Sequence, residues 1–397
     1  MKRLLVLAAG ILQVPVIKKA REMGIYVIAA DGDANAIGLK YADKAICANI
    51  IDEEEMLAIA REEKIDGVIH PCSEVSMHVM GRINEELGLS GITRQQALRA
   101  TNKHLMREAF EKGNAPSPKS ILTESAEDAW MHFFKFDGDA ILKPSRNSGS
   151  RGIAKVEKNI ETKDSFIKKY NEAFSESRDK SVLIEQFIEG PEFSIEIIVW
   201  NGMINVLTVT DKKTTGAPHF VELGHNQPSC FSSAEVEELK RVAIAGVKAL
   251  DVNNCACHAE AKLQNGKAYL MEIGARLGGD FISTVLTRLS TGIDMVAAAI
   301  NCALGIKPNL VPTEKKHGVC IRYFCPNPGK LMKISNTETL NDPHVYLWEI
   351  YRESGDIIPE ITSSLCRSGH VIVTADTPQE AVKLADMLVK EVIFETI

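Results

Sequence analysis

Short apolar runs alternate with helical periods in the first part of the chain. Residues 3–8 and 25–30 are apolar runs of strand length, and the apolar residues between them recur at helical spacing. A third apolar run, 66–70, precedes a helical stretch over 73–86. Strands that alternate with helices indicate βαβ units and a parallel sheet, so we expect a Rossmann-like domain over residues 1–92.

The remainder of the chain predicts mixed α/β units. Residues 93–120 form a helical connection that ends in a breaker cluster, NAPSP. We expect one small unit of strands and helices over 121–190, another over 191–310, and a last α/β domain over 311–397. The expected strands cover 140–143, 153–156, 182–186, 194–199, 206–210, 255–263, 267–273, 319–324 and 370–374. The expected helices cover 127–134 and 162–173, follow Ser232-Ser233, and begin at Thr377-Pro378.

Composition places the chain among globular proteins. Hydrophobic residues make up 45% and charged residues 25%, and no apolar run approaches the roughly 20 residues that span a bilayer. The net charge of −7 argues against binding nucleic acid through a general basic field. Nine cysteines, an odd number scattered along the chain, indicate reduced thiols and a cytoplasmic protein. We therefore expect neither a nucleic-acid partner nor a membrane partner.

Two local patterns could indicate other chemistry. Cys255, Cys257 and His258 form a cysteine–histidine cluster, but zinc needs further ligands at finger-like spacing, so we interpret the cluster as structural. The first strand-to-helix turn contains only Gly10, whereas a dinucleotide fingerprint needs three glycines. Asp31, at the end of the second predicted strand, keeps dinucleotide binding open, although a first domain without nucleotide is favoured.

A polar loop follows the strand that ends in Lys143. Residues 144–152 read PSRNSGSRG, which offers backbone N–H groups, hydroxyls and two arginines, as a polyphosphate requires. The loop is not a P-loop, because no Gly-Lys-Ser/Thr opens a following helix. A solvated hairpin turn explains the same residues, so the loop alone leaves both interpretations open.

The segment 183–194, LIEQFIEGPEFS, joins two predicted strands, and a purine could bind at this junction. Glu185 could accept a hydrogen bond from an exocyclic amine, and the backbone of Phe187 and Ile188 could bind the ring edge. Glu192 could bind ribose hydroxyls. An edge strand with solvated glutamates would have a similar sequence.

Two glutamates flank a predicted hairpin. Asn265-Gly266 marks the turn, and Glu260 and Glu272 lie at similar distances on either side, so they can face each other across the ladder. Two facing carboxylates repel unless a cation lies between them, and Mg²⁺ bound by carboxylates and substrate phosphates is the natural occupant. Arg276 follows shortly after and could hold an anionic substrate group.

Together these segments resemble the ATP-grasp superfamily over essentially all of the chain, including a TNKHLMRE helix that carries Lys103. The resemblance implies a Rossmann-like pre-ATP-grasp domain, an ATP-grasp fold of two α+β subdomains (a lid over 121–190 and a catalytic subdomain over 191–310), and a small α/β C-terminal domain. It implies an ATP site made of Lys103, Lys143, Ser148, Gly149, Ser150, Arg151, Gly152, Glu185, Gln186, Phe187, Ile188 and Glu192. Glu260 and Glu272 would hold Mg²⁺ (or Mn²⁺). Many relatives have Asn where this chain has Gly274, so a second metal ion would be held less fully.

Within that superfamily the C-terminal sequence 322–330, RYFCPNPGK, and the strand 369–375 are similar to the end domain of bacterial L-amino acid ligases, as is 222–229. The chain equally resembles phosphoribosylglycinamide synthetase-like and carbamoyl phosphate synthetase-like proteins. The resemblance therefore implies a ligase that uses ATP and Mg²⁺ to activate a carboxylate as an acyl phosphate and joins it to an amine. An amino acid is the favoured substrate.

The expected catalytic residues are Lys143 and Arg276, and the expected substrate contacts are Glu74, His225 and Arg276. His225 is expected in a loop that faces the site, and the alternative is a plain surface histidine. For Glu74 the alternative is an exposed glutamate beside a helix cap. Two other functions stay in view, an oxidoreductase that uses the first domain and a nucleotide-binding regulator without catalysis. The expected partners are small carboxylates and amines, and a homodimer through the first domain would fit the resemblance.

Overall fold

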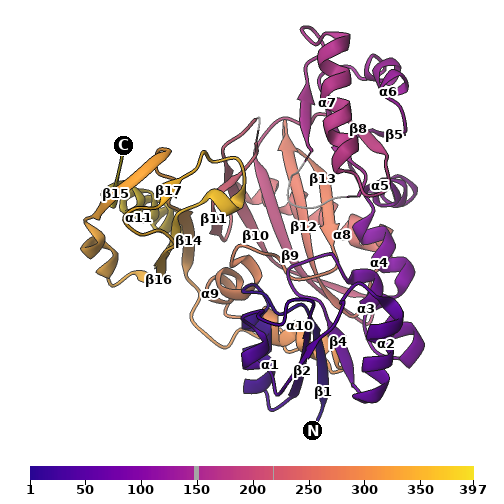
Figure 1. The fold of residues 1–397 in the computed structure, drawn as a ribbon, viewed down its shortest axis with the longest axis vertical. Helices are drawn as coiled ribbons and strands as arrows, with labels where there is room; N and C mark the ends of the chain where they lie inside the picture. The colour runs from indigo at the N-terminus through magenta and orange to yellow at the C-terminus, as the bar shows by residue number, and fades with distance from the viewer. Residues whose placement is uncertain (147–151, 218) are drawn as a thin grey trace.

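The structure is a computed structural model, and it describes residues 1–146, 152–217 and 219–397. Four residues of the predicted ATP site, Ser148, Gly149, Ser150 and Arg151, lie outside the described residues. Within the described ranges the strands form four sheets. The largest sheet runs through the middle of the molecule, and the smaller ones surround it (Figure 1).

The first sheet is parallel, with strand order β3-β2-β1-β4. Its strands are β1 (Arg3–Leu7), β2 (Tyr26–Asp31), β3 (Lys44–Cys47) and β4 (Gly67–Ile69), and its helices are α1 (Val14–Glu22), α2 (Glu53–Glu62) and α3 (Met77–Leu87). β1 and β2 are almost completely buried, as their unbroken apolar sequences predict. β3 was not predicted, because its residues are mostly exposed and its short sequence, KAIC, has no apolar run.

A second, antiparallel sheet has the order β5-β8-β6-β7 and projects from the rest of the molecule (Figure 1). It consists of β5 (Ser120–Thr123), β6 (Ala140–Pro144), β7 (Ala154–Val156) and β8 (Val182–Gln186), covered by α6 (Ala126–Phe133) and α7 (Lys163–Glu176). Phe133, Phe166 and Tyr170 lie in a hydrophobic core of its own. This unit therefore has a core separate from that of the central sheet, and we refer to it as the lid unit after the lid predicted over 121–190.

The central sheet has eight strands, and all neighbouring strands are antiparallel. In sheet order they are β13 (Lys267–Gly274), β12 (Cys255–Gln264), β9 (Glu192–Trp200), β10 (Met203–Thr214), β11 (Glu222–Gln227), β14 (Gly318–Tyr323), β18 (Gly369–Ala375) and β16 (Val345–Ile350). The last three strands belong to the C-terminal segment. That segment therefore continues the central sheet, whereas the sequence suggested a boundary between the two.

Helices cover the central sheet. Besides the helices already described, the described residues form α4 (Arg94–Thr101), α5 (Lys103–Lys112), α8 (Ser233–Leu250), α9 (Thr287–Thr291), α10 (Met295–Ala303) and α11 (Pro378–Glu391). A small third antiparallel sheet, β17-β15-β19, consists of β15 (Gly329–Ser335), β17 (Ile357–Ile358) and β19 (Ile393–Thr396). One hydrophobic cluster contains residues of the first domain, α5, α8 and the central sheet, so these elements share a core.

The predicted fold class is confirmed: the chain is a mixed α/β protein with a parallel first domain and two further units of strands and helices. No helix in the described ranges is both long and apolar enough to cross a membrane.

Candidate active site

Glu260 on β12 and Glu272 on β13 are direct partners across the hairpin ladder. A regular hairpin with this turn would pair Glu260 with Met271, since Ala261 pairs with Leu270. A β-bulge at Met271 shifts the register by one residue and brings Glu272 opposite Glu260. The facing carboxylates that the sequence predicted thus depend on an irregularity that the sequence did not reveal.

Cations surround these two carboxylates. Lys103 Nζ lies 3.1 Å from Glu272 Oε2, and Lys212 Nζ lies 3.2 Å from Glu260 Oε1. His258 Nε2 lies 3.5 Å from the same Glu260 oxygen. Burial alone would raise the pKa of Glu260 and Glu272, but the neighbouring cations outweigh it and hold both pKa values below their ordinary range. Both glutamates are therefore ionised at neutral pH.

Two ionised carboxylates that face each other fit a divalent cation. No group of three or more His, Cys, Asp or Glu side chains in the described part of the chain could hold a metal by itself. Mg²⁺ suits such a pair, because it is commonly bound by one or two carboxylates together with substrate phosphates and water. The structure explains why residue 274 is glycine. A Cβ at this position would lie 3.2 Å from the Arg276 side chain, which packs over the position where many relatives have Asn.

Arg276 connects the carboxylate pair to the first domain. Its Nη2 donates to Glu74 Oε1 at 2.9 Å, and Glu74 follows β4, at the carboxyl end of the parallel sheet. Burial raises the pKa of Glu74, and repulsion by Glu272 adds to the effect. Two of the residues predicted to contact substrate therefore lie together, beside a predicted metal ligand.

Lys143 and Glu185 form a buried ion pair, and Arg107 completes it. Arg107 Nε lies 2.8 Å from Glu185 Oε1, and its Nη2 donates to the Met271 carbonyl at 2.8 Å. Glu185 was predicted to accept from an adenine amine, but its carboxylate is directed at these two cations. Arg107 was missed by sequence reasoning, although its spacing of four residues from Lys103 on one helix places both cations on the same face.

The segment predicted to grip a purine continues from β8 toward β9. The Gln186 and Phe187 N–H groups donate to the Lys119 and Asp139 carbonyls, at 2.9 and 3.0 Å. The Phe187 ring lies under two ammonium groups, Lys155 at 4.8 Å and Lys262 at 5.2 Å from its centroid. Ile188 is buried, Glu192 pairs with Lys262 at 3.0 Å, and Gly152 has a left-handed backbone with φ of +71°.

His225 does not lie in a loop, and that prediction is wrong. It is buried in β11, directly paired with Lys212 of β10, and its Nε2 lies 3.3 Å from Asp280 Oδ2. The sequence of β11, ELGHNQ, lacks the apolar alternation that predicts a strand, because its buried side chains are the polar residues His225, Asn226 and Gln227. His225 nevertheless faces the site, since it lines the same cavity as Arg276.

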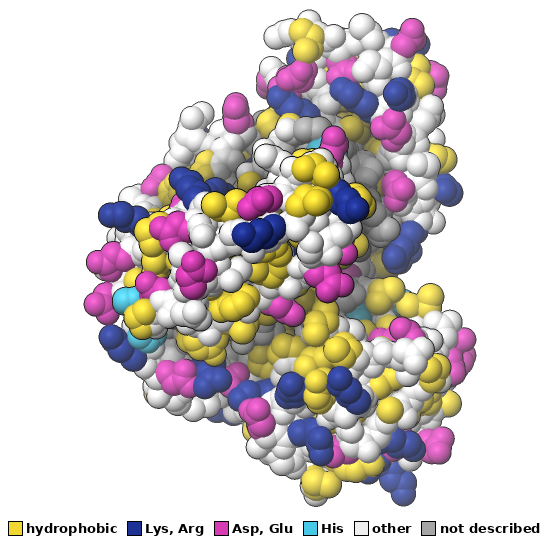
Figure 2. Space-filling view, turned by 60° about the vertical axis from the view of Figure 1, so that its left-hand side comes forward, with side chains coloured by type: hydrophobic (Ala, Val, Ile, Leu, Met, Phe, Trp, Pro, Cys, Tyr) yellow, Lys and Arg dark blue, Asp and Glu magenta, His cyan; other side chains and the backbone are white. Residues whose placement is uncertain are grey.

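That cavity has a volume of about 540 Å³. Its polar lining includes Lys212, Glu222, His225, His258, Glu260, Arg276 and Asp280, and residues 362–365 of the C-terminal segment form part of its wall. Its size suits a small molecule, and one predicted metal ligand opens into it. A space-filling view shows the surface hollowed between the projecting lid unit and the first domain (Figure 2).

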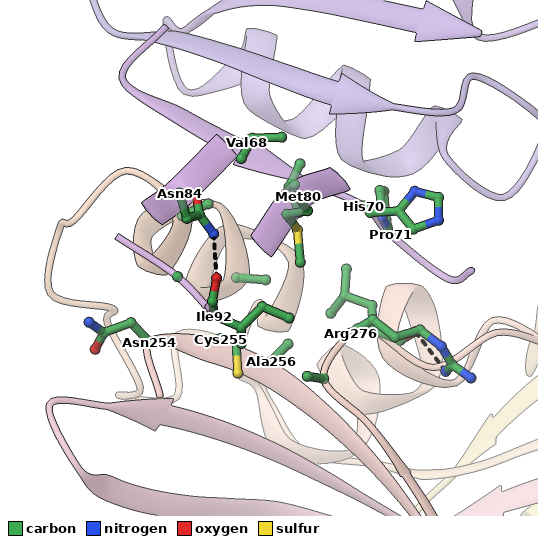
Figure 3. A pocket seen from close by; sticks show the side chains of 16 residues that line it. Val68, His70, Pro71, Met80, Asn84, Ile92, Asn254, Cys255, Ala256 and Arg276 are labelled. Atoms are coloured by element: carbon green, nitrogen blue, oxygen red, sulfur yellow. Dashed lines mark hydrogen bonds between the residues drawn. The ribbon is translucent and has the colours of Figure 1, made fainter. Parts of the chain in front are cut away.

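A second, apolar cavity lies between the first domain and the central sheet (Figure 3). Val68 and Met80 line it on one side and Ala256 on the other. Its volume of about 30 Å³ is close to what one water needs, so it cannot hold a substrate. Arg276 stands at its edge with the guanidinium pointing away from it (Figure 3), so the cavity belongs to the packing behind the active site.

Asp31, which kept dinucleotide binding open, has a local role. Its carboxylate accepts from the Ala9 N–H at 2.7 Å and from the Asp33 N–H at 2.9 Å. The first bond stabilises the turn after β1, where a dinucleotide would need an unobstructed backbone, and the second stabilises the turn after β2. This geometry disfavours an oxidoreductase that uses the first domain.

Comparison with known families decides the wider grouping. Residues 137–285 match the model of the ATP-grasp domain, and this range contains β6, β7 and β8 of the lid unit and the Glu260–Glu272 hairpin. This stretch of the chain is therefore similar to an ATP-grasp domain. Residues 322–396 match L-amino acid ligase C-terminal domain 2, and this range contains the strands β16 and β18 of the central sheet.

Individual relatives are distant. Human carnosine synthase 1 is 23% identical over 374 residues, covering 86% of this chain and 45% of the relative. Alanine–anticapsin ligase of Bacillus subtilis is 27% identical over 246 residues, covering 57% of this chain and 51% of the relative. The chain thus spans about half the length of these curated relatives.

Two solved structures share the fold over the whole chain. An L-amino acid ligase from Bacillus licheniformis superposes with a TM-score of 0.82 at 20% identity, covering 100% of this chain and 99% of the other. A phosphoribosylglycinamide synthetase from Anaerococcus prevotii superposes with a TM-score of 0.80 at 22% identity, covering 100% of both chains. The two domain matches agree with the predicted resemblance, and the solved structures show the same fold.

Proposed function

We propose that this chain is an ATP-dependent ligase that activates a carboxylate as an acyl phosphate and joins it to an amine, with an amino acid as one substrate. The observation that carries the proposal is the bulged hairpin, which places two ionised glutamates opposite each other between Lys103 and Lys212. The match of residues 322–396 to an L-amino acid ligase domain supports an amino-acid substrate.

Binding of ATP would use the cations around this hairpin. Lys103 and Lys143 would neutralise phosphate oxygens, and Glu185 with Arg107 holds Lys143 in place. Mg²⁺, held by Glu260 and Glu272, would neutralise the charge that develops on the transferring phosphoryl group. We retain Gln186, Phe187, Ile188, Glu192 and Gly152 as proposed ATP contacts, together with Ser148, Gly149, Ser150 and Arg151 beyond the described residues.

The substrates would meet at the Arg276–Glu74 pair. A carboxylate oxygen of the first substrate attacks the γ-phosphorus of ATP, and ADP leaves. Arg276 would hold the anionic group during this step and stabilise the tetrahedral oxyanion when the amine attacks the acyl carbon. Glu74 would orient the amine through hydrogen bonds, and closure of the lid would exclude the water that hydrolyses acyl phosphates.

Phosphate release from Mg-ATP with pooled amino acids and small carboxylates tests this proposal. Release should need both a carboxylate and an amine, and it should vanish in Glu272→Gln. Glu238→Gln is the matched control, because Glu238 forms an ion pair with Arg241 on the surface of α8, outside the site. Release that needs no second substrate, or that survives in Glu272→Gln, would contradict the proposal.

Two wider expectations stay proposals. All nine cysteines are free thiols among the described residues, in keeping with a reducing, cytoplasmic environment. A homodimer through the first domain is also proposed, and light scattering with a first-domain surface variant would test it.

A further inference from the structure

A further cavity, of about 320 Å³, adjoins the active site beside Glu74. Its lining consists of Ile51, Glu74, Val75, His78, Thr101, Arg146 and Arg178. Glu74 opens into this cavity and Arg276 opens into the large one, so the Glu74–Arg276 ion pair joins the two. The cavity lies between the first domain and the lid unit, because it takes residues from both.

The side chains that line this cavity carry mainly positive charge. Arg146 and Arg178 line it, and backbone hydrogen bonding fixes them side by side, since the Arg178 N–H donates to the Arg146 carbonyl at 3.2 Å. Within the described ranges neither guanidinium has a carboxylate partner. The one carboxylate of the lining, Glu74, is already bonded to Arg276. Two uncompensated guanidinium groups in one cavity favour an anion.

Neighbouring groups add to this preference. His78 lies in the first turn of α3, an eleven-residue helix with no acidic residue in that turn, so the positive end of the helix dipole is not offset. An outer cavity shares His78 and Arg146, but it also contains Glu53 and Glu85, whose negative charges offset the positive charges of Arg94 and Arg146. The inner cavity is therefore the more cationic of the two.

We propose that this inner cavity binds a second anionic group of the substrate, a carboxylate or a phosphate, at a distance from the reacting group. The inference rests on the proposed function, because it places the reacting group at the Arg276–Glu74 pair. A planar guanidinium pair matches carboxylate and phosphate oxygens by bidentate hydrogen bonding. The substrate class is then an amino acid with an acidic side chain or a phosphorylated amine, and not a neutral amino acid.

Titration calorimetry without ATP tests binding independently of turnover. The ligand pairs are L-aspartate with L-asparagine and O-phospho-L-serine with L-serine, since each pair differs in the anionic group. The wild-type protein should bind the anionic member at least about tenfold more tightly, and Arg178→Gln should lose that preference. Lys180→Gln is the matched control, because it removes a charge two residues away that does not line the cavity.

The outcomes separate the possible ligands. Preference for aspartate identifies a carboxylate subsite, and preference for phosphoserine identifies a phosphate subsite. Equal binding of charged and neutral members, or a preference that survives in Arg178→Gln, overturns the inference. Phosphate release provides the second readout: Arg178→Gln should raise the KM of the anionic substrate and leave the KM of ATP unchanged. A raised KM for ATP alone would assign Arg178 to the ATP site and also overturn the inference. Anion binding without turnover of any substrate would instead contradict the proposed ligase.

Discussion

Arg367 of the C-terminal segment forms a bidentate ion pair with Asp280. Asp280 lies four residues after Arg276 in the sequence. The Nη1–Oδ2 distance is 2.7 Å and the Nη2–Oδ1 distance is 2.9 Å. The guanidinium also lies 3.6 Å above the centroid of the Tyr323 ring. The C-terminal segment thus holds the loop that carries a predicted catalytic arginine.

The pair stabilises an unfavourable backbone conformation. Asp280 and Phe281 both have left-handed backbones, with φ of +50° and +62°, which non-glycine residues rarely adopt in succession. Arg367→Gln would leave a partly buried carboxylate, 24% exposed, without its main partner. We expect a loss on the order of 3 kcal/mol in the free energy of unfolding, measured by denaturant titration.

Arg241→Gln is the matched control for that variant. Arg241 makes the same bidentate contact with Glu238, at 2.7 and 2.9 Å, but its side chain is 58% exposed. Its loss should cost less than about 1 kcal/mol. Equal losses in the two variants would show that Arg367 has no special role.

Lys143 predicts a pH dependence of ATP use. Burial lowers its pKa to about 8, Arg107 and Lys103 act in the same direction, and Glu185 opposes them. A neutral lysine binds phosphate oxygens less well, so kcat/KM for ATP should fall as the pH rises through about 8.

Glu185→Gln tests the assignment of that pH dependence. It removes the carboxylate that keeps Lys143 protonated, so the pKa of Lys143 should fall further and the loss of kcat/KM should move to lower pH. A profile that stays flat to high pH, or that moves upward in the variant, would exclude Lys143 as the titrating group.

Gly278 and Gly279 should respond differently to substitution by alanine. A Cβ at Gly278 would lie 2.5 Å from His258 Nδ1, whereas a Cβ at Gly279 would meet no atom within 4 Å. Because His258 also contacts Glu260, Gly278→Ala should displace the metal site and lower kcat by about tenfold or more. Gly279→Ala should stay within about twofold of the wild type, and steady-state kinetics of both variants checks the contrast.

The regular parts of the fold could be predicted because local sequence determines them. The buried strands β1 and β2, the hairpin β12–β13 and the capped helix α11 each have an apolar run, a turn sequence or a capping residue. β11 lacked such a pattern, and the continuation of the central sheet through β14 arises from pairing between segments far apart in sequence.

The candidate site was predictable to the extent that residue type indicates chemistry. Glu260 and Glu272 stood out as carboxylates on the two strands of a predicted hairpin, and Lys143 as a lysine that ends a predicted strand. Their partners Lys212 and Arg107 did not, because a lysine or arginine inside an element looks like a surface residue until the fold places a buried carboxylate against it. Ion pairs across elements need tertiary structure.

Transfer of ¹⁸O tests the central claim, that a carboxylate is activated by phosphorylation. The enzyme is supplied with Mg-ATP, an amine and a substrate labelled with ¹⁸O in its reacting carboxylate, and the released phosphate is analysed by mass spectrometry. Attack of the carboxylate on ATP, followed by expulsion of phosphate by the amine, moves one carboxylate oxygen into the phosphate. We predict one ¹⁸O atom in each phosphate released from fully labelled substrate; phosphate without the label, released together with the amide product, would contradict the acyl phosphate mechanism.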